Sequence, residues 1–367
     1  MPTPISIIQF GLGGVGRALV QQVFATREAQ ARHGIALRYI AVADSAGAIV
    51  GERGLDESIV ESAARLKERG GNLHEHEAGY FQQSLAALID LAGQPQTVVV
   101  DTTAAEADSL LPAFDLALSR GYALVLANKK PLTASLETWQ RLTGEGRAGY
   151  EATVGAGLPV ISTLRHLLDT GDEVHRIEGV LSGTLGYLMS ELQEGAAFGA
   201  AVRDAKARGW TEPDPRDDLS GMDVARKMLI LARTLGYTGE LEDVSVTPLY
   251  PASFAALSLD DFMARLDELD VDLAAQRDEA HGAGQRLRYA ATIHPGNPDQ
   301  PAQLRAGPTS VPTDSPLGAL RGPDNLLAFY TSRYAARPLV VQGAGAGVEV
   351  TASALLGDIL RLAHETR

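Results

Sequence analysis

The first 150 residues alternate between short apolar runs and amphipathic segments. The apolar runs predict buried strands at residues 5–10, 37–42, 97–100 and 122–127. An amphipathic segment over residues 17–33 predicts a helix that ends before Gly34. The pattern weakens between residues 47 and 80, where we expect a helix and an exposed loop. Strands that alternate with helices are typical of parallel βαβ units, so this part of the chain predicts an α/β fold with a parallel sheet.

The pattern changes from about residue 152 onward. Strands are predicted at residues 177–181, 287–294, 326–330 and 338–342. Helices are predicted over residues 183–193, 198–208, 223–235, 262–280 and 348–364. The segment 295–316 is rich in Pro, Gly, Asp and Gln, so we expect turns between strands there. This mixture predicts a second domain of the α+β type.

The composition excludes several kinds of chemistry. The 367 residues contain no cysteine, which excludes disulfides, thiolate zinc sites and cysteine nucleophiles. The net charge of −14 disfavours binding to nucleic-acid phosphates. No apolar run approaches the roughly 18 residues that a membrane helix needs, and the first residues lack the features of a signal peptide. We therefore expect a cytoplasmic protein that binds neither nucleic acid nor membranes.

A glycine-rich loop follows the first predicted strand directly and opens the first helix. It has the sequence Gly11-Leu12-Gly13-Gly14-Val15-Gly16, which matches the G-x-G-x-x-G pattern in the context that dinucleotide binding requires. Gly11 permits a tight turn, Gly13 lets the backbone approach a pyrophosphate, and Gly16 lets the helix pack against the strand. The helix N-terminus offers N–H groups and a positive dipole end to the phosphates. The alternative is an ordinary glycine-rich turn, but the context favours a Rossmann-type domain that binds NAD or NADP.

Polar residues follow the second and third predicted strands. Asp44 ends the second strand, where a carboxylate can accept both adenosine-ribose hydroxyls and so favours NAD over NADP. It lies 28 positions after Gly16, more than the usual ~20, and the alternative is a capping aspartate in a turn. Thr103 belongs to Asp101-Thr102-Thr103 after the third strand, at the sheet edge that faces a ligand. The alternative for Thr103 is an N-cap of the following helix.

The segment 209–227 concentrates carboxylates. Five of them fall within twelve positions, at Glu212, Asp214, Asp217, Asp218 and Asp223. A calcium loop of the EF-hand type is excluded, because no glycine falls at the sixth loop position. Two readings remain: a solvated surface loop, or a pocket for a substrate that carries an ammonium group. The sequence pattern leaves both open.

Two lysines are candidates for proton transfer. Lys227 lies four positions after Asp223 on a predicted helix, so the two side chains share a face outside the apolar stripe of Val224, Met228, Leu231 and Leu235. An exposed pair of this kind is usually a weak surface ion pair. Lys129 follows the fourth strand, at the ligand-binding edge of the sheet. A partly desolvated lysine there can exchange a proton with a substrate hydroxyl, and the alternative is a turn lysine in solvent.

At these residues the chain resembles the homoserine dehydrogenase family. The resemblance follows family order over nearly the whole chain, through GLGGVG at 11–16, ANKKP at 127–131, YEATVGAGLPVIS at 150–162, GVLSGTLGYLMSEL at 179–192, GWTEPDPRDDLSGMDVARK at 209–227 and QGAGAGVEVTA at 342–352. It implies NAD(P)-dependent interconversion of L-homoserine and L-aspartate 4-semialdehyde, a step in threonine, methionine and isoleucine biosynthesis. It also implies a homodimer.

The resemblance assigns catalytic and substrate-binding roles to several residues. Lys227, Asp223 and Lys129 are implied to be catalytic, with Lys129 also close to the cofactor. Glu212 is implied to bind the amino group of the substrate. The rest of the substrate pocket is implied to contain Asp217, Asp218, Thr184 and Gly183.

The resemblance also implies cofactor contacts and an ion site. Thr103 and Gly347 are implied to contact the cofactor, and Gly347 implies that the C-terminal helix joins the nucleotide domain. We therefore expect a dinucleotide domain of residues 1–150 plus 335–367, and a substrate and dimerisation domain of residues 151–334. A monovalent cation, sodium or potassium, is implied at Glu151 and at the backbone carbonyls of Val154, Ala156 and Leu158.

Two features depart from the family pattern. Trp210 stands where the family commonly has tyrosine, so a phenol contact to substrate is not expected. The sequence ends 20 residues after Gly347, so we expect a short, monofunctional form without an ACT-type regulatory domain or a fused aspartate kinase.

Aspartate-semialdehyde dehydrogenase, the rival enzyme, needs a cysteine that this chain lacks. A sensor that binds NAD without chemistry would explain the glycine loop but not the lysines and carboxylates.

Overall fold

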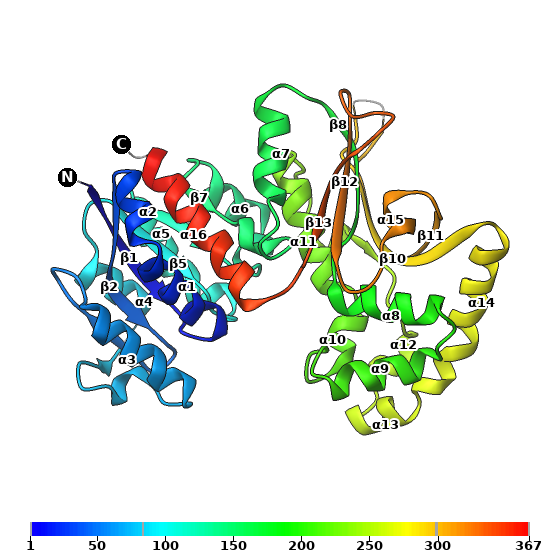
Figure 1. Cartoon of the computed structure of the whole chain (residues 1–367), viewed down its shortest axis with the longest axis horizontal. Coiled ribbons are helices and arrows are strands. Elements are labelled where there is room, and N and C mark those ends of the chain that lie inside the picture. The colour runs from blue at the N-terminus through cyan, green and yellow to red at the C-terminus, as the bar shows by residue number, and fades with distance from the viewer. Residues whose placement is uncertain (1, 83, 298–299, 366–367) are drawn as a thin grey trace. The chain divides into compact units, whose positions relative to one another are not determined.

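The computed structural model describes residues 2–82, 84–297 and 300–365, and the chain divides into two compact units (Figure 1). The first unit contains Met1–Gly157 together with Ala346–Arg367, and the second contains Leu158–Gly345. The last helix of the chain therefore belongs to the same unit as the N-terminal strands. Within the described residues, no helix is both long and apolar enough to cross a membrane.

The first unit is built on one sheet with the strand order β4-β3-β2-β1-β5-β6-β7. The strands from β2 to β7 in this order pair in parallel, whereas β3 and β4 are antiparallel additions at one edge. The apolar runs of β1 and β5 are fully buried, as a sheet covered on both faces requires. The strands span Thr3–Phe10 (β1), Ile35–Ala43 (β2), Gly47–Val50 (β3), Tyr80–Phe81 (β4), Thr97–Asp101 (β5), Ala123–Leu126 (β6) and Ala148–Gly149 (β7).

Helices cover both faces of this sheet. They span Gly14–Ala25 (α1), Arg27–Arg32 (α2), Glu57–Glu68 (α3), Leu85–Ala92 (α4), Ala107–Ser119 (α5), Leu136–Thr143 (α6) and Val348–Glu365 (α16), with short 3₁₀ turns at Leu73–Glu75 (η1), Pro131–Thr133 (η2) and Glu151–Thr153 (η3). Helix α16 packs beside α1, and its Leu355 and Ile359 join the same buried core as Leu19. Strands β2 and β5 lie on opposite sides of β1, so the order of the strands in the sheet reverses at β1. Such a switch point in a parallel sheet leaves a crevice at the carboxyl ends of the strands.

The second unit has a mainly antiparallel sheet with the order β13-β12-β8-β10-β11-β9. Its strands span Val174–Val180 (β8), Ser245–Val246 (β9), Gln285–His294 (β10), Gln303–Pro312 (β11), Asn325–Thr331 (β12) and Leu339–Gly343 (β13). Its helices span Val160–Asp169 (α7), Gly183–Gln193 (α8), Phe198–Ala207 (α9), Pro215–Leu219 (α10), Met222–Thr234 (α11), Ala252–Ala255 (α12), Leu259–Ala264 (α13), Asp270–Gly282 (α14) and Pro316–Ala319 (α15), with 3₁₀ turns at Leu241–Asp243 (η4) and Leu266–Leu269 (η5). The predicted fold class, a Rossmann-type parallel sheet followed by an α+β region, is confirmed.

Four element predictions were wrong. The helix expected over 17–33 is divided at Thr26 into α1 and α2. The segment 47–80 contains the strands β3 and β4 besides helix α3. The helix expected over 262–280 is divided into α13, η5 and α14. The segment 295–316 contains the ten-residue strand β11 and not only turns, because β11 pairs with β10 along its whole length. Pro298 and Asp299 of that segment lie outside the described residues.

Candidate functional site

The glycine loop has the geometry that its sequence predicts. Gly11 has a φ of +90°, in the left-handed region that favours glycine. A Cβ on Gly16 would press against the Gly11 carbonyl, so helix and strand can approach this closely only with glycine there. A Cβ on Gly13 would meet no atom within 4 Å, so its backbone faces open space. Helix α1 starts at Gly14 without a side-chain cap or an acidic first turn, which fits a bound pyrophosphate.

Two polar side chains that the sequence analysis did not single out hold this loop. Gln9 is fully buried, and its Nε2 donates to the carbonyls of Gly11 and Gly16 at 2.9 and 3.0 Å. The Thr102 hydroxyl donates to the carbonyl of Gly11 at 2.8 Å. A buried polar residue must find hydrogen-bond partners. The available signal was therefore a glutamine inside an apolar strand, two positions before the first glycine.

Both carboxylate oxygens of Asp44 accept hydrogen bonds, as the alternative of a capping aspartate in a turn predicts. Its Oδ1 accepts the amides of Ala46 and Gly47 at 2.8 and 2.7 Å. Its Oδ2 accepts the amide of Leu73 at 2.9 Å and forms an ion pair with Lys67 at 2.7 Å. These donors hold the pKa of Asp44 below its usual value, although burial opposes them as the largest single effect. A carboxylate has about four acceptor sites. The four contacts within the described residues match this number, and the expectation that Asp44 binds ribose and favours NAD stays a prediction.

The ends of β5 and β6 place Thr103 and Lys129 at the carboxyl edge of the sheet. The amide of Thr103 donates to Oδ1 of the buried Asp101 at 2.9 Å. Thr103 does not cap helix α5, whose N-cap is Glu106. Lys129 is half-buried, and its carbonyl accepts the amides of Leu132 and Thr133, which begins the turn η2. The edge position predicted for both residues is therefore present.

The expected cation loop lies where the chain passes from the first unit to the second, between Gly157 and Leu158. Gly155 and Ala156 both have a positive φ, of +81° and +56°. The Leu158 carbonyl accepts the amide of Val160 at 2.8 Å. Among the described residues, no three His, Cys, Asp or Glu side chains form a metal-binding group.

Gly347 precedes helix α16 in the first unit. Its φ of +139° lies in the region that favours glycine. Its carbonyl accepts both the amide and the hydroxyl of Thr351, at 3.1 and 2.7 Å, which closes the first turn of α16. A Cβ added to Gly14 would lie 3.2 Å from the side chain of Val348, the residue after Gly347. The start of α16 therefore lies against the glycine loop.

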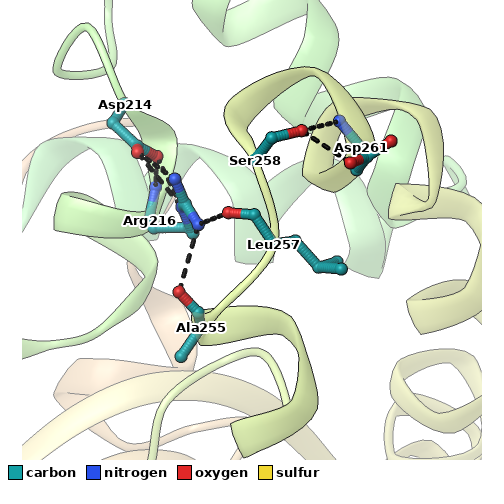
Figure 2. Close-up of polar contacts among 6 residues, drawn as sticks. All are labelled: Asp214, Arg216, Ala255, Leu257, Ser258 and Asp261. Atoms are coloured by element: carbon teal, nitrogen blue, oxygen red, sulfur yellow. Dashed lines mark hydrogen bonds and ion pairs between the residues drawn. The ribbon is translucent and has the colours of Figure 1, made fainter.

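In the second unit, one carboxylate of the acidic segment holds the loop in place (Figure 2). Both oxygens of Asp214 accept from the Arg216 guanidinium, at distances from 2.5 to 3.1 Å. The same guanidinium donates to the carbonyls of Ala255 and Leu257 at 3.2 and 2.6 Å. The Arg216 side chain thereby lowers the pKa of Asp214. Asp214 is thus a structural residue that joins helix α10 to the segment after α12.

Lys227 is buried beside two oxygen partners. Its side chain lies on α11 and the residue is only 8% exposed, so it is not part of a surface ion pair. Its Nζ donates to the Leu181 carbonyl at 2.7 Å and forms an ion pair with Asp223 at 2.8 Å. An ammonium group has three N–H donors. Two are used within the described part of the chain, so the third can serve a substrate oxygen.

Asp218 lies close to several of the predicted pocket residues. Its Oδ2 accepts the amide of Glu212 at 2.7 Å. Burial raises the pKa of Asp218, the Glu212 amide and the Thr184 hydroxyl lower it, and the charges of Glu212 and Asp223 raise it again. The Thr184 hydroxyl also donates to the Trp210 carbonyl at 2.7 Å, and its single proton serves only one acceptor at a time. The structure therefore brings Thr184, Glu212, Asp218 and Asp223 into one region.

The remaining residues of the acidic segment are more exposed. Glu212 and Asp217 are exposed, and neither they nor Asp218 form an ion pair within the described residues. Gly183 is the first residue of α8, where a Cβ would approach the Pro323 carbonyl at 3.2 Å. The ring of Trp210 is half exposed and packs edge-on against Tyr187 at 5.0 Å between centroids. The segment thus combines two neutralised carboxylates with three that can attract a cation.

Comparison with known proteins identifies the family. The family described as homoserine dehydrogenase matches residues 159–360, more than half of the chain. The homoserine dehydrogenase of Emericella nidulans is 36% identical over 378 residues, which cover 99% of each chain. The chain belongs to the homoserine dehydrogenase family. The resemblance seen in the sequence motifs is confirmed, and with it membership of a family of NAD(P)-dependent oxidoreductases.

Longer relatives and a solved structure extend this comparison. The bifunctional aspartokinase/homoserine dehydrogenase 2 of Zea mays is 39% identical over 372 residues, which cover 98% of this chain but 39% of that protein. The chain thus spans about two fifths of the bifunctional relatives that it matches. A hyperthermophilic archaeal homoserine dehydrogenase, solved in complex with NADPH, superposes with a TM-score of 0.75 at 23% identity, covering 99% of this chain and 98% of that one. At that identity the likeness supports the fold alone.

Proposed function

We propose that this homoserine dehydrogenase family member interconverts L-homoserine and L-aspartate 4-semialdehyde with NAD or NADP as the redox partner. The observation that carries the proposal is Lys227, a buried lysine that is paired with Asp223 in the same region as Thr184, Glu212 and Asp218. A purely structural lysine has no need of two further carboxylates and a hydroxyl in the region of its ion pair. The family match gives this arrangement its substrate.

The first unit is proposed to bind the dinucleotide. The open backbone at Gly13 and the uncapped start of α1 fit a pyrophosphate, and Gly11, Val15 and Gly16 shape the turn beneath it. Thr103 and Gly347 lie at the ends of the neighbouring elements and are proposed to contact the cofactor. When bound, the nicotinamide would accept the hydride in oxidation and supply it in reduction. The dinucleotide domain is therefore proposed to be the first unit, Met1–Gly157 with Ala346–Arg367, whose bounds lie near the expected ranges 1–150 and 335–367.

The second unit is proposed to hold the amino acid. Glu212 and Asp218 would attract the substrate ammonium group, with Asp217 adding negative charge at the entrance. Thr184 and Gly183 lie at the N-terminus of α8, where N–H groups and a hydroxyl suit the substrate carboxylate. These assignments account for Glu212, Asp217 and Asp218, the three carboxylates of the acidic segment that carry no ion pair within the described residues.

Proton transfer is proposed to involve a lysine. In oxidation, Lys227 or Lys129 in its neutral form, or a water that it orients, would take the proton of the substrate hydroxyl as the hydride leaves. In reduction, the protonated lysine would return that proton, and its positive charge would stabilise the alkoxide that develops as the hydride arrives. Asp223 supports this role of Lys227, because the pair keeps the ammonium group in one orientation.

Two further expectations remain part of the proposal. A sodium or potassium ion at Glu151, Val154, Ala156 and Leu158 is supported by the two consecutive positive φ angles, which turn backbone carbonyls away from an ordinary ladder. A homodimer is the assembly expected from the family, and a cytoplasmic location is expected from the sequence.

The test is the reduction of NAD⁺ and NADP⁺ by L-homoserine at alkaline pH, followed by the appearance of the reduced nicotinamide. We expect turnover with at least one cofactor, and a lower rate when sodium and potassium are replaced by a bulky organic cation at equal ionic strength. A protein that binds the dinucleotide but reduces none of it would instead be a sensor. Equal rates in all three salts would remove the cation from the proposal.

A further inference from the structure

Asp101 is a buried carboxylate that the proposed mechanism does not use. It is the last residue of β5, where it pairs with Phe10 of β1 and Leu126 of β6, and it is 0% exposed. Its Oδ1 accepts the Thr103 amide at 2.9 Å. Its Oδ2 is buried and accepts no hydrogen bond of good geometry within the described residues. A buried charge of this kind is costly, so its presence under the cofactor edge calls for a function.

Side-chain hydrogen bonds join the loop after β5 to the loop after β6. The Asn128 side chain donates to the Ala105 carbonyl at 2.9 Å and accepts the Lys130 amide at 3.1 Å. The Lys130 Nζ donates to the Ala104 carbonyl at 3.0 Å. Asn128 therefore holds the residues on either side of Lys129, and it anchors them to the loop that carries Thr103.

Asp101 contacts both halves of this junction. The Thr103 amide donates to it, and the Thr103 hydroxyl and the Asn128 side-chain amide lie near enough to lower its pKa against the larger effect of burial. No charged side chain is among the groups that shift it, so hydrogen-bond donors alone stabilise its ionised form. When the carboxylate takes up a proton, its attraction for these donors weakens, and a new O–H donor competes with them.

We propose that Asp101 is a positioning residue for Lys129: its ionised form holds the Thr103 amide, and the loop that follows Thr103 is bound in turn by Asn128 and Lys130, which flank the lysine. Protonation of Asp101 loosens that loop. This inference rests on the proposed dehydrogenase function only where it concerns catalysis. Its structural part, the order of residues 127–133, is independent of any activity.

The first test is hydrogen–deuterium exchange in residues 127–133 of the full-length protein, followed by mass spectrometry. Asp101→Asn keeps an acceptor for the Thr103 amide but removes the charge. We expect faster exchange in this segment than in wild type at pH 8. Wild type itself should approach the variant as the pH falls to 5, after correction for intrinsic exchange rates. Equal exchange in both proteins at both pH values would overturn the proposal.

The second test is the pH profile of turnover with L-homoserine. Asp101→Asn should lower kcat roughly ten- to hundredfold, the scale of a displaced catalytic group, and it should remove the acid limb that wild type shows. Asn128→Ala should lower kcat in the same way without changing the carboxylate. An unchanged limb in Asp101→Asn would refute the inference and leave the dehydrogenase function intact, whereas an inactive wild type would refute only the function.

The matched control is Asp172→Asn. Asp172 is another buried aspartate, but it lies in the second unit and accepts the Thr331 hydroxyl and the Arg333 amide at 2.7 and 3.2 Å. We expect this variant to change neither exchange in residues 127–133 nor the acid limb. If it changes both as Asp101→Asn does, the effect is general destabilisation and the positioning role is wrong.

Discussion

Asp218 is a carboxylate of the second unit whose surroundings raise its pKa. Burial raises its pKa above the usual value, so it takes up a proton at a pH where an exposed aspartate stays ionised. Binding of an ammonium group needs the ionised form. We therefore expect KM for L-homoserine to rise as the pH falls through the raised pKa of Asp218.

The variant Asp218→Asn should raise KM roughly tenfold at neutral pH, the scale of a lost charge-assisted hydrogen bond. Its KM should then stay flat over the range in which the wild-type value rises. Asp261→Asn, at the exposed N-terminus of α13, serves as the control and should follow wild type. A pH-dependent KM that survives in Asp218→Asn would assign the titration to another group.

Asp101 also gives a prediction for stability. Burial raises its pKa to about 6, and the nearby Thr103 and Asn128 donors oppose the shift. The folded protein therefore binds the proton more tightly than the unfolded chain. The contribution to stability is complete below the unfolded pKa of 3.8 and is lost as the pH rises through about 6.

Asp101→Asn is neutral at every pH, so it avoids this loss. Relative to wild type, the variant should gain stability between pH 4 and pH 7, by about 2–3 kcal/mol at ~1.4 kcal/mol per pKa unit. Chemical denaturation of both proteins at pH 4, 5, 6 and 7 measures the difference. A difference that stays constant with pH would mean that Asp101 does not titrate in this range. A more stable but less active variant is the pattern expected where an active site holds a costly group.

Single residues were predictable where one local rule decides their role. Gly11, Gly13 and Gly16 have the turn, the open backbone and the close packing that their spacing indicates. Asp44 was not predictable, because its partners Lys67 and Leu73 reach it from elements beyond the strand. The burial of Lys227 was equally hidden, since an i,i+4 pair with Asp223 has the same sequence on a surface or in a core.

The strand–loop–helix element at the N-terminus offers a prediction in which two glycines behave differently. Gly13→Ala places a methyl group in the open space proposed for the pyrophosphate, so binding of NAD⁺ and NADP⁺ should weaken roughly tenfold or more. The melting temperature should hardly change. Gly16→Ala instead presses on the Gly11 carbonyl and on Gln9, and overpacking of this kind typically costs ~1–3 kcal/mol.

Titration calorimetry and thermal melting separate the two effects. Gly357→Ala, in the interior of α16 with no atom within 4 Å of the added Cβ, is the control for the methyl group itself. Normal dinucleotide affinity in Gly13→Ala would mean that the cofactor does not lie against this backbone.

Helices and strands were predictable where the apolar spacing and the capping residues indicate the same bounds. They were missed where strand pairing stabilises a segment whose composition indicates turns. Helix α8 has the predicted bounds 183–193, because its apolar positions and the Ser182 cap point to the same start. Strand β11 contains two prolines and a glycine, so its composition indicates turns, yet ten consecutive pairs with β10 stabilise it. Long-range pairing of this kind has no signal in a local window.

At the scale of the whole molecule, the candidate residues are divided between the two units. Lys129, Thr103 and the glycine loop belong to the first unit, whereas Lys227, Asp223 and Glu212 belong to the second. Local patterns therefore indicate a nucleotide domain and an acidic segment separately. The nucleotide domain and the acidic segment were connected to one reaction only because their motifs occur in the order typical of the family. The family match now supports that connection.

Lys227, the buried lysine of the second unit, is proposed together with Lys129 to act on the proton that homoserine gives up. The measurement that bears on this first is kcat for the oxidation of L-homoserine in wild type and Lys227→Ala, with Lys206→Ala on helix α9 as the control for a lost lysine charge. We expect a fall of at least ~100-fold in kcat for Lys227→Ala, the scale of lost acid–base catalysis, with near-normal folding and a much smaller change in KM. A wild-type kcat in Lys227→Ala would exclude Lys227 from proton transfer.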